Sequence, residues 1–150
     1  MFGEMVIGSK NRRLYARYLI GEARHLMYMA RQKELVPCHI SPRQGGILDV
    51  LSNIGHKATL AELAKYTGRK MSSLSVQMTR MENDGLVKKT KETLKSNLVS
   101  FELTVKGSDI YNYSKDMKSD KIIMSVLSDE ECEQLISMLK KLINKAGKYV

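Results

Sequence analysis

The chain has 150 residues, a formal net charge of +9 at neutral pH and an isoelectric point of about 9.6. This length is enough to bury one hydrophobic core, and the positive charge favours a polyanionic partner, a nucleic acid or an acidic membrane surface, over a neutral one. No apolar run is long enough to span a bilayer and no signal-peptide core is present, so we expect a soluble cytoplasmic protein. Cys38 and Cys132 match no disulfide framework and no metal-ligand spacing, so we expect no metal or other cofactor.

The positive charge is concentrated in one segment. Residues 69–95 carry seven lysines and arginines against three acidic residues, whereas residues 128–136 carry four acidic residues and no basic one. A local excess of this kind favours nucleic acid over a membrane surface as the partner.

Residues 11–35 predict a long first helix, preceded by an arm, residues 1–10, without clear periodicity. The apolar side chains of the helix fall on two adjacent tracks, which together make a face wider than one small core needs. We therefore expect part of this helix to be buried against a second subunit. The tracks are Leu14, Tyr18, His25 and Met29, and Tyr15, Leu19, Leu26 and Ala30.

Capping motifs mark the starts of the following helices. Residues 41–44, 59–62 and 128–131 each place a hydroxyl side chain three positions before Gln or Glu, which is the capping box, and Pro42 suits a first helical position. Thr104 is expected to cap a further helix. The predicted helices cover residues 42–54, 60–66 and 72–84, then run from 104 toward 117 and from 128 onward.

The helix over residues 72–84 is the predicted recognition helix. Leu74, Met78 and Met81 share one face and should pack inward, and the remaining surface is rich in hydroxyl groups and nearly free of acids. Such a face is often merely solvated, but the helix order and the basic loop after it favour contact with base edges and phosphates. The expected DNA-reading residues are Ser72, Ser73, Ser75, Val76, Gln77, Thr79 and Arg80.

Residues 86–90 and 98–103 predict a strand pair joined by a polar, basic loop. Lysines at such a hairpin can reach DNA, and they can also protect an edge strand from pairing. The wing residues expected at DNA are Lys88, Lys89, Lys91, Lys95, Ser96 and Asn97, and contacts to the DNA backbone are expected from Ser41, Arg43, Arg69 and Lys70. The whole pattern predicts a mainly α fold with a small β-hairpin wing (α+β), a winged helix-turn-helix with N- and C-terminal dimerisation helices.

This order of motifs resembles the MarR family of bacterial and archaeal transcription regulators over roughly residues 11–145. The pieces that carry the resemblance are residues 41–51, 59–64, 72–87, 103–107 and 127–131, followed by the leucine-bearing last helix. The resemblance implies an obligate homodimer with interlocked terminal helices, in which each subunit offers one winged helix to a pseudo-palindromic DNA site. Many members are repressors released by a small ligand, others sense oxidants through a cysteine, and a few bind metal.

The wing departs from the family pattern. The family usually carries an Asp-x-Arg signature before the second strand of the wing. Counting back from Thr104, this chain has Lys95, Ser96 and Asn97 at those positions, so both the aspartate and the arginine are absent. Lysine is a point charge without a planar fork, so weaker shape readout in the minor groove is expected. The expected domains are residues 1–36, an arm and dimerisation helix, residues 37–105, the DNA-binding domain, and residues 106–150, the C-terminal dimerisation helices.

The sequence therefore predicts a dimeric, sequence-specific regulator of transcription that binds double-stranded DNA, most simply a repressor. A small-molecule effector is a further expected partner, with a pocket near Tyr15, Tyr18, His25 and His39, and Cys38 is a candidate redox site. The alternatives are a winged helix used as a protein-interaction scaffold and a cysteine-based redox sensor. No catalytic motif is present, so we do not expect an enzyme.

Overall fold

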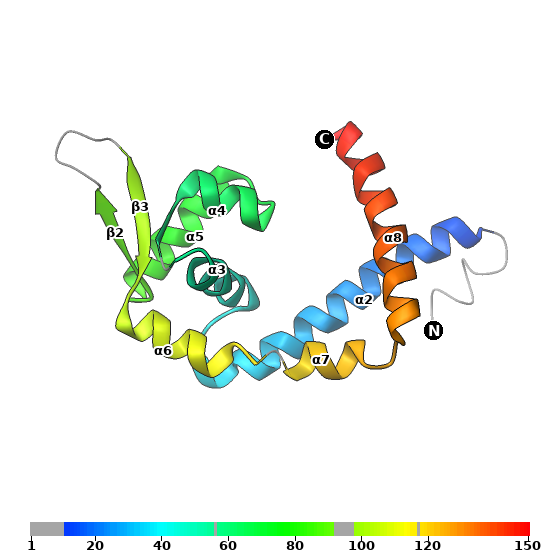
Figure 1. Ribbon diagram of the computed structural model, residues 1–150, viewed down its shortest axis with the longest axis horizontal. Coiled ribbons are helices and arrows are strands. Elements are labelled where there is room, and N and C mark those ends of the chain that lie inside the picture. The colour runs from blue at the N-terminus through cyan, green and yellow to red at the C-terminus, as the bar shows by residue number, and fades with distance from the viewer. Residues whose placement is uncertain (1–10, 56, 92–97, 117) are drawn as a thin grey trace. The chain divides into compact units, whose positions relative to one another are not determined.

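The computed structural model describes residues 11–55, 57–91, 98–116 and 118–150 (Figure 1). The chain divides into two compact units between Met117 and Lys118. The first unit contains α2 (Arg12–Leu35), η1 (Val36–Cys38), α3 (Pro42–Asn53), β1 (Lys57–Thr59), α4 (Leu60–Thr67), α5 (Met71–Asn83), β2 (Val87–Lys91), β3 (Val99–Leu103) and α6 (Val105–Ser114). The second contains α7 (Lys118–Met124), α8 (Asp129–Ala146) and η2 (Gly147–Tyr149).

The predicted helix starts are confirmed. Complete capping boxes open α3 at Ser41, α4 at Thr59 and α8 at Ser128, and the Thr104 side chain caps α6. The Asn11 side chain caps α2 in the same way. Local hydrogen bonds between a side chain and the first turn therefore fix where most helices begin.

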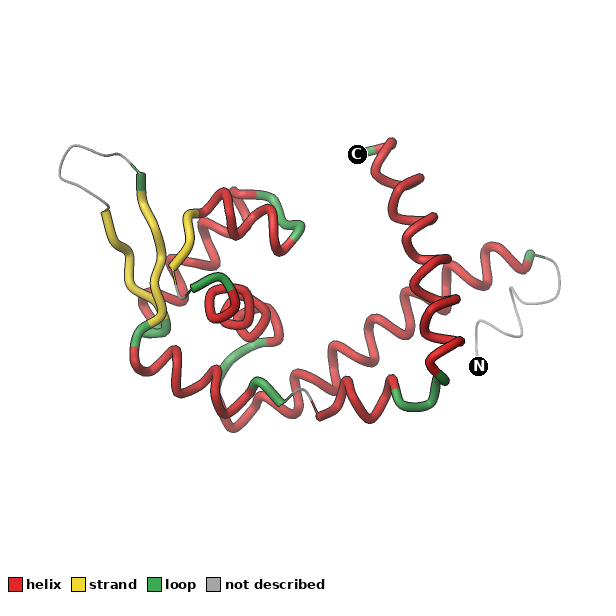
Figure 2. Tube along the Cα trace, in the orientation of Figure 1, coloured by secondary structure: helices red, strands yellow, loops and turns green. Residues whose placement is uncertain are grey.

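The described residues form a sheet of three antiparallel strands in the order β1-β3-β2, which Figure 2 draws side by side. The predicted hairpin is confirmed, with Val87 opposite Leu103. Strand β1 was not predicted, because three residues are too few to give an alternating pattern. Ala58 of this strand is buried and lies opposite Phe101.

The chain after β3 differs from the prediction. The helix expected from Thr104 toward residue 117 ends at Ser114, and a separate seven-residue helix, α7, follows at Lys118. No capping motif announces α7 in the sequence, and its length gives fewer than two full turns of periodic signal.

The core of the first unit lies between α3, α4, α5 and the sheet. Leu74, Met78 and Met81 of α5 are each fully buried, as their shared face predicts. This anchoring orients the opposite face of α5 outward. The other fully or nearly fully buried apolar side chains are Leu35, Ile47, Leu48, Leu51, Ala58, Leu63, Leu86 and Val87.

The turn after α5 is locked against the start of α6. Gly85 has a φ of +71°, and its carbonyl oxygen accepts a hydrogen bond of 2.6 Å from the Thr104 hydroxyl. A Cβ on Gly107 would collide with the Leu86 carbonyl oxygen, so α6 can approach this closely only with glycine there. The end of α5 and the beginning of α6 therefore form one rigid junction.

Candidate nucleic-acid interface

The outward face of α5 is polar and open to solvent. Ser72, Ser73, Ser75, Thr79 and Arg80 are exposed, Val76 is 56% exposed, and Gln77 is half-buried at the edge of the face. The structure thus brings the predicted reading residues together on one helix surface. Small hydroxyl side chains and the apolar Val76 side chain suit close approach to base edges in a major groove.

The N-terminal end of α5 is suited to meet negative charge. Its N-cap residue, Lys70, makes no side-chain capping hydrogen bond, and the first turn contains no acid. Amide groups at such an end point along the helix axis and attract anions such as phosphate. Farther along α5, the Thr79 hydroxyl donates a hydrogen bond of 3.0 Å to the Ser75 carbonyl, so in the observed rotamer its oxygen is left to act as an acceptor for an external group.

The wing lysines that the structure describes, Lys88, Lys89 and Lys91, do not form one cluster. Lys89 and Lys91 lie two residues apart on one face of β2, whereas Lys88 lies on the other face, with its Nζ 3.4 Å from Glu102 Oε2. Exposed ion pairs of this kind contribute about 0–1 kcal/mol, but the carboxylate still offsets the charge that Lys88 would offer to DNA. The predicted wing residues Lys95, Ser96 and Asn97 lie outside the described residues.

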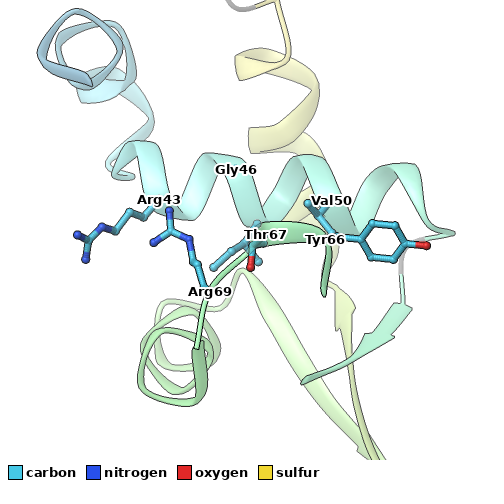
Figure 3. Close-up of a pocket in the computed structure, with 7 residues that line it drawn as sticks. Arg43, Gly46, Val50, Tyr66, Thr67 and Arg69 are labelled. Atoms are coloured by element: carbon cyan, nitrogen blue, oxygen red, sulfur yellow. The ribbon is translucent and has the colours of Figure 1, made fainter. Parts of the chain in front are cut away.

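Two of the predicted backbone-contacting residues share a pocket. Arg43 in the first turn of α3 and Arg69 in the turn before α5 both line a pocket of about 220 Å³ between α3 and α4. Figure 3 shows both side chains extending to the same side of this pocket. The remaining lining residues are Gly46, Ile47, Val50, Tyr66 and Thr67.

Ser41 and Lys70, the other two residues predicted to contact the DNA backbone, differ in whether their side chains are available to an external group. The Ser41 hydroxyl accepts a hydrogen bond from the Gln44 amide at 3.3 Å and lies 3.1 Å from the Gln44 Oε1 atom, so it serves as the cap of α3. Lys70 is exposed at the start of α5. The structure therefore leaves Lys70, but not the Ser41 hydroxyl, open to an external anion.

The predicted effector residues are distributed over two places. Tyr15, Tyr18 and His25 lie along α2, whereas His39 follows η1 with a φ of +54°. His39 lines a cleft of about 500 Å³ that the three α2 residues do not line. This cleft also touches the end of α5 and the start of α6, through Asp84, Leu86, Lys106 and Ile110, and is completed by Pro37, Cys38 and Ile40.

Arg31 is a structural residue that the sequence analysis missed. Only 8% of it is exposed, and its guanidinium donates to Glu34 Oε2 at 2.8 Å and to the Ser114 carbonyl oxygen at 2.7 Å. It thereby ties the C-terminal end of α2 to the C-terminal end of α6. Burial raises the pKa of Asp49 on α3, and the nearby Arg31 charge partly opposes that rise.

The environment of Cys38 disfavours the thiolate. Burial raises the pKa of the Cys38 thiol, the Arg31 guanidinium lowers it by a smaller amount, and Glu34 raises it further. Because the thiolate is the reactive form, this environment does not activate the cysteine toward oxidants. Among the described residues no group of three or more His, Cys, Asp or Glu side chains is placed to hold a metal ion.

A membrane span requires a helix that is both long and apolar. Within the described ranges of the chain, no helix meets both requirements.

Comparisons with known proteins give matches in structure. No protein-family model and no curated protein matches the chain. The organohalide-sensing transcriptional regulator RdhR, solved bound to 2,4-dichlorophenol, is 27% identical, with a TM-score of 0.84 over 93% of this chain and 84% of that one. AbsC, a MarR family transcriptional regulator from Streptomyces coelicolor, is 24% identical, with a TM-score of 0.80 over 93% of this chain and 96% of that one.

A third similar structure contains DNA. MepR from S. aureus, solved as a complex with DNA, is 22% identical, with a TM-score of 0.77 over 86% of this chain and 96% of that one. The fold is therefore shared over nearly the whole length of this chain and of these neighbours.

Proposed function

We propose that this chain regulates transcription as a homodimeric repressor that binds a pseudo-palindromic duplex DNA site. The premise is its fold, which it shares with the MarR-family winged-helix transcriptional regulators. The observation that carries the proposal is the exposed face of α5, which has hydroxyl groups and Arg80 but no acidic side chain before Glu82. This face enters the major groove. Lys89 and Lys91 of β2 lie against the neighbouring backbone.

The terminal helices support the homodimer. Helix α8 is strongly amphipathic, yet none of its 18 residues is buried, and Ile143 is 70% exposed. In α2, Leu26 and Met29 are 57% and 50% exposed. Exposed apolar side chains on the face of a helix are typical of an interaction site, and a second copy of the chain offers the matching surface by symmetry. Residues 1–36 and 106–150 then serve dimerisation, and residues 37–105 bind DNA.

A small-molecule effector is part of the proposal. RdhR was solved with a chlorinated phenol, and the cleft beside His39 has a volume in the range of small-ligand sites. Because the cleft touches Asp84 at the end of α5, a ligand there would contact the turn that holds the recognition helix. Tyr15, Tyr18 and His25 would belong to a separate surface of α2.

The rival proposals have less support. A protein-interaction scaffold would need an apolar or acidic face on α5, and the observed face is polar and basic. A redox sensor would need a depressed pKa at Cys38, and burial raises it instead.

The test is selection of bound sequences from a random duplex pool at near-physiological salt, combined with the mass of the protein in solution. A two-fold-symmetric consensus and a dimer mass support the proposal. Binding without a consensus would indicate an architectural DNA-binding protein, and an absence of binding by the effector-free protein would refute the proposal.

A further inference from the structure

The pocket between α3 and α4 carries two arginines at its mouth. Arg43, Gly46 and Val50 lie on one face of α3 at helical spacing, and Arg69 approaches from the turn before α5 (Figure 3). Both arginines are exposed, and among the described residues neither has a carboxylate partner. Two positively charged guanidinium groups on one side of a small pocket favour an anion bound between them.

The chemistry of the pocket favours phosphate. The guanidinium group is always charged and offers a planar fork of donors that fits phosphate oxygens. The Thr67 hydroxyl already donates to the Leu63 carbonyl at 2.6 Å, so among the described lining residues the positively charged donors are Arg43 and Arg69. None of the described residues that line the pocket is acidic, so no carboxylate there repels an anion.

The position of the pocket identifies the source of the phosphate. Arg69 lies two residues before α5 begins at Met71, beside the helix end that lacks a side-chain cap. A duplex that receives α5 in its major groove places a backbone strand at this end of the helix. The pocket therefore faces a phosphate of the groove edge rather than a base.

We propose that Arg43 and Arg69 together clamp a single DNA backbone phosphate at the mouth of this pocket, and that Gly46 leaves the space this phosphate needs. A Cβ on Gly46 would meet no atom of the chain within 4 Å, so the gap at this position is open to a ligand. The inference rests on the proposed DNA-binding function. It adds that the two arginines act on one phosphate, not on two.

The first experiment counts phosphates through salt dependence. The slope of log affinity against log salt is measured on the selected site for the wild type, Arg43→Ala, Arg69→Ala and the double variant. Each neutralised phosphate contributes about 0.9 to the slope, roughly an eightfold change in affinity between 1 M and 0.1 M salt. A shared phosphate predicts that the slope of the double variant falls by no more than about 0.9 per half-site, whereas two separate phosphates predict a fall of about 1.8.

The second experiment locates the phosphate. Single methylphosphonate linkages, which are uncharged, are placed one at a time along a half-site. One linkage should weaken wild-type binding and have no further effect on the double arginine variant. Lys65→Ala is the matched control, because it removes an exposed positive charge from α4 outside the pocket and should leave the sensitivity to that linkage intact.

The third variant tests the gap. Gly46→Leu should lower DNA affinity with an unchanged or higher melting temperature, because the new side chain enters open space and replaces a helix-destabilising glycine. Additive decreases of the slope in the double arginine variant would overturn the shared clamp, and unchanged binding in both single variants would remove the arginines from the interface. Failure of the wild type to bind any duplex would instead refute the proposed function itself.

Discussion

The winged-helix region and the terminal helices differ in how far their apolar side chains are buried. In α5, Leu74, Met78 and Met81 are completely buried within one chain. In α8, by contrast, Leu142 and Ile143 are 53% and 70% exposed, although both helices have an apolar face. The first region buries its hydrophobic surface within one chain, and the second leaves apolar surface exposed, where the proposed homodimer would cover it. The difference separates residues that stabilise the fold from residues that are available for the proposed dimerisation.

The strongest test of this contrast is a cavity in the core. Leu48→Ala should lower the free energy of unfolding by about 2–5 kcal/mol, because the Leu48 side chain is fully buried. The measurement is chemical denaturation at fixed protein concentration. Val105→Ala is the control, since Val105 is 80% exposed and its truncation should change stability by about 0.5 kcal/mol or less. Equal decreases in the two variants would contradict the contrast.

A charge on α8 should act on assembly instead. Ile143→Glu places a carboxylate on the exposed apolar face and should weaken the proposed dimer by about 1–3 kcal/mol, or roughly 5-fold to 150-fold. Sedimentation equilibrium measures the dissociation constant. Asn144→Glu adds the same charge at the neighbouring exposed position and should have little effect. An unchanged dissociation constant for Ile143→Glu would remove this face from the interface.

Arg80 tests whether the exposed face of α5 reads sequence. Arg80→Ala should weaken binding to the selected site by about 1–3 kcal/mol while affecting random DNA much less, if the guanidinium contacts a base edge. Titrations on both duplexes at one salt concentration give the comparison. Equal weakening on the two duplexes would assign Arg80 to the DNA backbone.

Lysine substitutions in the wing should have a smaller effect on DNA binding, and the effect should differ between the two faces of β2. Substituting Lys89 and Lys91 together by Ala should reduce the salt slope by up to about 0.9 for each phosphate that the variant no longer neutralises. Lys88→Ala should reduce it less, because Glu102 lies 3.4 Å from the Lys88 amine and offsets its charge. The reverse order would mean that the Lys88 face of β2 is the one that meets DNA.

The smallest effect concerns the pH dependence of Cys38. Burial raises the pKa of its thiol, so at a given pH less thiolate is present in the folded protein than in the unfolded chain. In a Cys132→Ser background, the alkylation rate should therefore rise at higher pH for the folded protein than for the same chain in urea. A folded-state profile at lower pH would revive the redox-sensing alternative.

Local signals explain which parts of the fold could be predicted. The starts of α3, α4 and α8 lie in four-residue motifs whose hydrogen bonds close within one turn, so the sequence alone specifies them. Strand β1 and helix α7 were missed because each is too short for a periodic pattern. Their existence depends on packing and pairing with distant segments.

The candidate site divides along the same line. The polar face of α5 was predicted because it follows from helical spacing around Leu74 and Met78. The shared position of Arg43 and Arg69 at one pocket could not be predicted, since it requires α3 to pack on α4. The contact of Arg31 with Ser114 joins residues 83 positions apart and has no local sequence signal. The Lys88 pair with Glu102 depends likewise on strand register.

Helix α6 connects the C-terminal end of α2 with the end of α5. At one end, Arg31 of α2 grips the Ser114 carbonyl, and at the other, Lys106 donates to the Asp84 carbonyl at 2.7 Å where α5 terminates. Helix α6 is thus hydrogen-bonded to other elements at both of its ends. These two hydrogen bonds give a direct connection through α6 between the C-terminal end of α2 and the turn where α5 ends.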